Sequence, residues 1–137
     1  MKIELKSREG CTYKKLCGSA SETHSETELI IPDTLEDILR ILCCRYQCRI
    51  REKLVSTDAV DVLGDIDITV VYLPDTATGV RVVGTSVPFE LHFDAPGADS
   101  TSLAVTRLSS LSVDARAVNP RKISLSANVF MEQSCFK

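Results

Sequence analysis

The stretch that decides the fold is DVLGDIDITVVYL, residues 61–73. Apolar and polar side chains alternate along it, and this period of two is typical of a β-strand that buries one face. The apolar face consists of Val62, Ile66, Ile68, Val70 and Tyr72, and the polar face of Asp61, Asp65, Asp67 and Thr69. The sequence therefore predicts one long strand here, with its aspartates on the solvent side.

The same alternation recurs downstream, between segments of turn composition. PDTATG (74–79) and APGADS (95–100) have that composition, VPFELHF (87–93) lies between them, and two more alternating segments flank Asn119 and Pro120. The apolar positions are Val87, Phe89, Leu91, Phe93, Leu111, Val113, Ala115, Ala117, Ile123, Leu125, Ala127, Val129 and Met131. Short strands separated by turns favour a mainly β fold, an antiparallel β-sandwich or open barrel.

One short amphipathic helix is predicted ahead of the long strand, over about residues 34–42. Leu35, Ile38, Leu39 and Leu42 fall at i, i+3, i+4 and i+7, which is the spacing of one apolar helical stripe. Asp33, which follows a proline, is placed to cap the first turn. We expect this helix to pack across the sheet.

The chain divides into three segments. Residues 7–27 are rich in Ser, Thr and Glu and carry no sustained period, so residues 1–27 are expected to form an extended N-terminal arm. Residues 28–131 are predicted to form the β domain, and residues 132–137 a C-terminal tail that carries a cysteine. With 137 residues, of which 44% are hydrophobic, the chain is large enough for one core without a metal or disulfide.

Composition also argues against several partners. The formal net charge is −3 and no run of Lys or Arg suits a phosphate backbone, so no nucleic-acid partner is expected. The start, MKIELKSREG, has no apolar signal region, and no apolar run approaches the roughly 20 residues of a membrane helix. We therefore expect synthesis in the cytoplasm, without a signal peptide or a membrane partner.

Enzyme signatures are sparse. The two histidines are His24 in the polar arm and His92 on the outward side of a predicted strand, where a solvated role is more common than general-base chemistry. No phosphate loop, nucleophile elbow or HExxH pattern is present. The alternate aspartates of residues 61–67 are more typical of a solvated strand face than of a calcium site. We expect no catalytic residue and no cofactor.

Six cysteines need an explanation other than a metal site. Their spacings, C-x5-C and CC-x3-C, do not form the paired knuckles of a structural zinc site, so no metal is expected. Of the adjacent pair, one is expected to enter the core and the other to point out. All six are candidates for disulfides within or between chains, formed late in an oxidising environment: Cys11, Cys17, Cys43, Cys44, Cys48 and Cys135.

From about residue 28 to 131 the chain resembles the SPOCS domain, a module of sporulation and spore-coat proteins in endospore-forming bacteria. The matching stretches are ELIIPDTLEDILRIL, DIDITVVYL, VPFELHFDAPGA and AVNPRKISLSANVFM. The resemblance implies a non-enzymatic β-rich module that acts in spore-surface assembly. Larger members repeat this domain and join it to a LysM domain, whereas this chain has one copy and adds cysteine-bearing ends.

These features together predict a structural, self-assembling subunit of the spore surface, whether a coat layer, a ring or an appendage-like fibre. The partner would be the chain itself, and further spore-coat proteins are possible partners; strand exchange and disulfides between subunits would stabilise the assembly. The alternative is a small adaptor that recruits another coat morphogenetic protein through a sheet edge. Either protein would be made in the mother-cell cytoplasm and placed on the spore surface.

Overall fold

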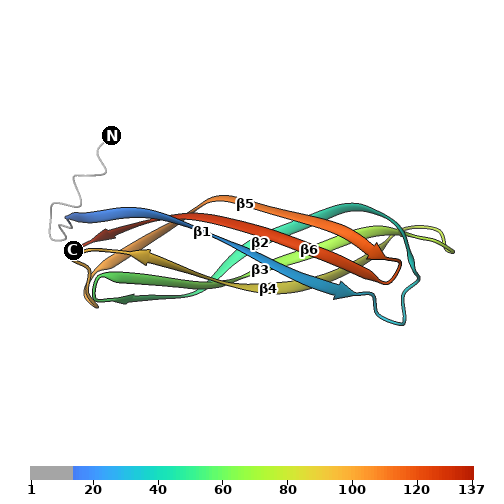
Figure 1. Cartoon of the computed structure of the whole chain (residues 1–137), viewed down its shortest axis with the longest axis horizontal. Coiled ribbons are helices and arrows are strands. Elements are labelled where there is room, and N and C mark those ends of the chain that lie inside the picture. Colours follow the sequence, from blue (N-terminus) through green and yellow to red (C-terminus); the bar gives the residue numbers. More distant parts are fainter. Residues whose placement is uncertain (1–13) are drawn as a thin grey trace.

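A computed structural model describes residues 14–137, which form six β-strands and no helix. The strands pair into two antiparallel three-stranded sheets, in the orders β1-β6-β5 and β2-β3-β4, that form the two layers of an elongated molecule (Figure 1). Their bounds are β1 Lys15–Ile30, β2 Ile38–Ser56, β3 Ala59–Pro74, β4 Arg81–Asp94, β5 Leu103–Asn119 and β6 Lys122–Phe136. The predicted mainly β, antiparallel architecture is confirmed. Within residues 14–137 no helix is long and apolar enough to cross a membrane.

The two central strands, β3 and β6, supply most of the core. Every second residue of β3 from Val60 to Pro74 is buried, and so is Ile123 with its alternate neighbours on β6. The predicted inward faces of β3, β4 and β6 are confirmed, and the two sheets share one apolar cluster. Their edge strands also face one another, β1 beside β4 and β2 beside β5. The core therefore lies between the layers, under the central strands.

The helix predicted over residues 34–42 is wrong, because β2 begins inside that range. Two bulges interrupt the pairing of β2 with β3, and Leu39 and Leu42 are the extra residues that they insert. Both leucines point to solvent, with exposed fractions of 66% and 42%. The inward positions become Ile38, Ile41 and Cys44. Each bulge adds one residue, so these inward residues lie three positions apart in the sequence. This spacing resembles the apolar stripe of a helix.

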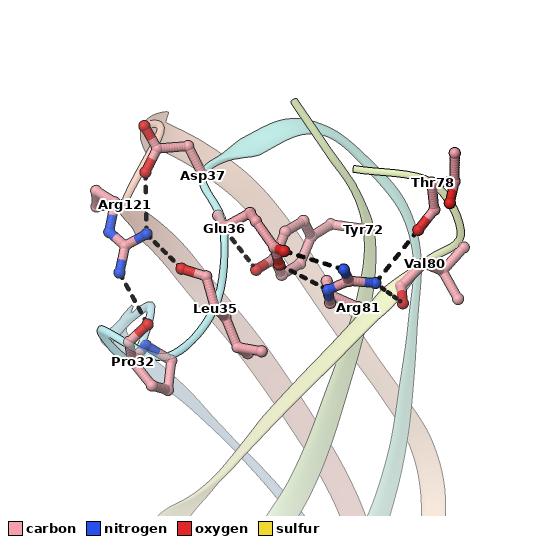
Figure 2. Close-up of polar contacts among 9 residues, drawn as sticks. All are labelled: Pro32, Leu35, Glu36, Asp37, Tyr72, Thr78, Val80, Arg81 and Arg121. Carbon is pink, nitrogen blue, oxygen red and sulfur yellow. Dashed lines mark hydrogen bonds and ion pairs between the residues drawn. The ribbon is translucent and has the colours of Figure 1, made fainter. Parts of the chain in front are cut away.

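Arg121, in the turn between β5 and β6, fixes the segment that leads into β2. Its guanidinium donates hydrogen bonds to the carbonyl oxygens of Ile31 at 3.1 Å, Pro32 at 2.8 Å and Leu35 at 2.7 Å. It also pairs with Asp37 at 2.9 Å (Figure 2). The Pro32 carbonyl oxygen also accepts a hydrogen bond of 3.0 Å from the Leu35 N–H. Arg121 thus adds donors to a connection that is not helical and makes few main-chain hydrogen bonds of its own.

A second arginine holds the same connection from the β4 side. Arg81 donates to both carboxylate oxygens of Glu36, at 2.7 and 3.1 Å, and the Tyr72 hydroxyl donates to the Glu36 carbonyl oxygen at 2.8 Å (Figure 2). The ion pair keeps the pKa of the Glu36 carboxyl below its ordinary value. The Pro32–Asp37 connection is therefore tied to both sheets.

The predicted N-terminal arm is wrong from Lys15 onward, because this part of the chain is β1. It pairs along its whole length with β6. Between Cys17 and Leu29, which pack against the core, its inward side chains are small hydroxyl residues that lie opposite buried positions of β6. They are Ser19, Ser21, Thr23, Ser25 and Thr27. A strand whose inner face is Ser and Thr shows no apolar alternation, and this hid it in the sequence. Residues 1–13 of the predicted arm lie outside the described residues.

The predicted C-terminal tail is also part of the sheet. β6 continues to Phe136, and Gln133 and Cys135 lie buried between the layers. Main-chain hydrogen bonds of 2.8 and 2.9 Å between Lys14 and Lys137 close this end of the β1–β6 pair. The described residues thus form one unit from Lys14 to the last residue, without a separate tail.

Gly64, in the middle of β3, allows two neighbouring strands to approach closely. A Cβ atom built on it would lie 2.4 Å from the Arg49 carbonyl oxygen and 2.7 Å from the Phe89 ring. The adjoining pairing with β2 contains a third bulge, between Ile50 and Glu52. Only glycine leaves room for this bulge beneath the aromatic ring.

Candidate assembly surface and cysteines

Four strands of the described chain are sheet edges. β1 and β5 each pair only with β6, and β2 and β4 each pair only with β3. These edge strands are 14 to 19 residues long, so each presents a long row of main-chain N–H and C=O groups. Long unprotected edges are templates for pairing with another chain.

Exposed apolar side chains are concentrated on two edge strands, β2 and β5, and we call the flank that these strands form the β2/β5 side. Twelve large apolar side chains of residues 14–137 are exposed, and nine belong to these two strands. They are Leu39, Leu42, Tyr46, Ile50 and Leu54 on β2, with Leu103, Val105, Leu108 and Val118 on β5. The opposite flank, the β1/β4 side, has only Ile30 and Val82 on its strands.

Three of these side chains occupy inward positions and still reach solvent. Tyr46 pairs with Ile68 and Leu108 pairs with Met131, both of which are fully buried, yet Tyr46 and Leu108 are each 42% exposed. Ile50, opposite Gly64, is 39% exposed. Paired residues on neighbouring strands share a face, so these side chains line a seam that the chain's own sheets leave open.

Cys17 and Cys135 lie directly opposite each other on β1 and β6. Cys135 is fully buried, and its Sγ accepts a hydrogen bond of 3.1 Å from Gln133 Nε2. Burial, followed by the charge and thiol hydrogen bond of Cys135, raises the pKa of Cys17. The two thiols are reduced in the structure and adjacent across the ladder.

Gln133, next to this pair, is a buried polar residue that the sequence reasoning missed. It is 1% exposed, and its Oε1 atom has no hydrogen-bond partner among the described residues. Its alternation with Met131 and Cys135 was the available signal, but the segment was interpreted as a tail. An amide at this position polarises the environment of the Cys135 sulfur.

The cysteines of β2 separate onto two faces. Cys43 is exposed, whereas Cys44 lies opposite Val70 and packs against the core, as expected for an adjacent pair. Cys48 shares the inner face with Cys44. Burial raises the pKa of both inner thiols, so both are protonated at neutral pH. Cys11 lies outside the described residues.

The outward aspartates of β3 are occupied by neighbouring strands. Asp61 accepts a hydrogen bond of 2.7 Å from His92 Nδ1, which raises the pKa of His92. Asp65 pairs with Arg51 at 2.7 Å and Asp67 with Arg49 at 3.5 Å. Across residues 14–137 no three His, Cys, Asp or Glu side chains are placed to hold a metal ion.

Comparison with known proteins gave one match. The family model described as SipL, SPOCS domain, covers residues 37–118, which is more than half of the chain and spans β2 to β5. No curated protein and no solved structure matched the chain. The matched region contains both strands of the β2/β5 side and the closely packed β3. The chain therefore belongs to the SPOCS domain family.

Proposed function

We propose that this protein is a structural, self-assembling subunit of the spore surface, non-enzymatic and stabilised by contacts between copies of itself. Membership of the SPOCS family supports a role connected with sporulation. The mother-cell cytoplasm would be its site of synthesis and the spore surface its destination. Its product would be a coat layer, ring or fibre.

The observation that carries this proposal is the open β2/β5 side. β2 is a 19-residue edge strand with five exposed large apolar side chains, and β5 adds four more. β2 does carry bulges and basic side chains, which usually protect a sheet edge, yet its large apolar side chains stay exposed to solvent. A neighbouring chain that covers the half-exposed apolar side chains at inward positions would remove their surface from water, which favours binding.

Disulfides complete the proposal as a late step. Cys43 is the exposed β2 thiol. Its partner would be Cys11 of a neighbouring copy, because β4 and β5 contain no cysteine and Cys17 lies opposite Cys135 of its own chain. The protonated inner thiols of Cys44 and Cys48 would resist exchange in the reducing cytoplasm. Oxidation after the mother cell opens would then lock subunits that non-covalent contacts have already positioned.

Negative-stain electron microscopy and sedimentation velocity of the full chain, with and without reductant, test the proposal. We expect rings or filaments without reductant, and assemblies that are looser or shorter with it. Small particles and a monomer boundary under both conditions would contradict self-assembly and favour the adaptor. A variant with Cys43→Ser separates covalent from non-covalent contributions, because it should assemble but lose part of its resistance to dilution.

A further inference from the structure

The two flanks of the molecule carry opposite charges. β2 contains five basic and one acidic side chain, and β5 contains two basic and one acidic. β1 contains three acidic and one basic side chain, and β4 contains two acidic and one basic. The basic residue of β4, Arg81, is already paired with Glu36. The apolar β2/β5 side is therefore basic, and the β1/β4 side is acidic.

Several of these charges have no ion-pair partner among residues 14–137. Arg40 and Arg45 of β2 are exposed and form no such pair, and neither do Glu22 of β1 and Glu90 of β4. Arg49 and Arg51 also lie on β2, but they face the aspartates of β3. The unneutralised charges thus sit on the outermost strands, where a neighbouring molecule would meet them.

We propose that the β2/β5 side of one copy binds the β1/β4 side of the next. The subunits then lie side by side, and each contact joins two different surfaces. This inference rests on the proposed self-assembly and adds the two surfaces that meet. Each sheet would continue into the same sheet of its neighbour, with β5 beside β1 and β2 beside β4. In both junctions a mainly basic strand meets a mainly acidic one.

The charge pattern selects this contact over a symmetric dimer. Two β2/β5 sides placed against each other would bring together Arg40 and Arg45 of both copies, which form no ion pair among residues 14–137, and like charges across an interface are costly. A contact between two different surfaces does not close after two subunits. It continues until the rotation between neighbours completes a ring, or indefinitely as a filament.

Topology supports a common direction for neighbouring subunits. In a three-stranded antiparallel sheet the two outer strands run the same way, so β5 and β1 are parallel to each other, as are β2 and β4. Copies with aligned long axes therefore form parallel junctions in both layers. The half-exposed seam residues Tyr46, Ile50 and Leu108 would be covered in the same step.

Complementary charge reversal tests the pairing. One variant reverses the basic side and a second reverses the acidic side, using exposed residues of all four edge strands. The first carries Arg40→Glu, Arg45→Glu and Arg116→Glu, and the second carries Glu22→Lys, Glu26→Lys and Glu90→Lys. Each variant alone then has two flanks of like sign. We expect its self-association, measured by sedimentation velocity with reductant present, to weaken by about tenfold or more.

Mixing the two variants provides the decisive readout. In a chain where the two variants alternate, contacts between two reversed flanks take turns with contacts between two native flanks, and the charges are opposite in both kinds. We therefore expect equimolar mixing to restore assemblies in which the two chains alternate. A control with Asp75→Lys and Thr76→Lys adds positive charge at exposed positions of the loop between β3 and β4, and should assemble like the wild type. Circular dichroism of each variant checks that the strands are intact.

The remaining outcomes separate this inference from the proposed function. Wild-type-like assembly of both variants, or a mixture that stays dispersed, would overturn the pairing of flanks and leave self-assembly standing. Loss of assembly in the loop control alone would move the contact to the ends of the molecule and would also overturn it. A wild-type chain that never assembles would overturn both proposals.

Discussion

Arg121 lies partly in solvent. We expect its replacement to lower the free energy of unfolding more than the replacement of any other partly exposed side chain. Replacing it with Met keeps the aliphatic stem and removes every hydrogen bond of the guanidinium. Three carbonyl oxygens of the connection between β1 and β2 lose a donor, and Asp37 loses an ion-pair partner.

The expected loss follows from these contacts. A typical intramolecular hydrogen bond contributes about 1 kcal/mol net, and an exposed ion pair contributes at most about that amount. The Arg121 side chain is 35% exposed, so the larger values for desolvated charged donors do not apply. We expect the free energy of unfolding to fall by about 2–4 kcal/mol. With a urea slope of about 2 kcal/mol per molar, the midpoint should fall by roughly 1–2 M.

Urea unfolding of dispersed, reduced protein, followed by circular dichroism, provides the measurement. Arg116→Met is the matched control, since this arginine is exposed on β5 and its loss should change stability by less than about 0.5 kcal/mol. Arg121→Lys should fall between the two, because one ammonium group cannot reach all the acceptors at once. Equal midpoints for the two Met variants would refute the role assigned to Arg121.

Three further outcomes are expected. Gly64→Ala should lower the free energy of unfolding by about 1–3 kcal/mol, because the added Cβ meets a carbonyl oxygen and an aromatic ring. Gly18→Ala is the control: its Cβ makes only ordinary contacts, so its stability in the same urea titration should be close to that of the wild type. Because burial raises the pKa of Cys17, oxidation with glutathione disulfide should be faster at alkaline than at neutral pH. It should join Cys17 to Cys135 within one chain and give one linked peptide pair after digestion; unlinked peptides would contradict the pairing. The pKa of His92 is raised, so its ion pair stabilises the fold fully below about pH 6.5, and this contribution disappears as the pH rises through the raised pKa. Thermal stability of the wild type should therefore decline across that range, and the decline should be smaller in His92→Gln.

The sequence predicted those strands whose inner face is apolar and whose pairing is regular. β3, β4 and β6 meet both conditions, and their buried positions match the predicted alternation. β1 fails the first condition because its inner face is Ser and Thr, and β2 fails the second because of its bulges. A period of two is visible in a sequence only where the strand itself contains no extra residue, and whether a bulge forms depends on the pairing with the neighbouring strand.

The candidate site was predictable only in its residue types. The cysteines and the separation of an acidic segment before Ile30 from a basic segment after Ile38 are both present in the sequence. That Cys17 faces Cys135 depends on the register between the first and last strands, which residue spacing does not encode. The sequence also does not reveal that these two segments form opposite flanks. This depends on the strand order, in which the acidic β1 is an edge of one sheet and the basic β2 is an edge of the other.

The bulges of β2 connect the error in the sequence prediction to the proposed assembly. Bulges usually protect an edge by twisting it away from other chains. Here they also turn Leu39 and Leu42 outward, so that the edge gains apolar surface while its pairing becomes irregular. An irregular, basic and apolar edge disfavours pairing with its own copy or with arbitrary strands, yet it can accept one surface of matching charge and shape. The irregularity that imitates a helix in the sequence would therefore make the proposed contact selective.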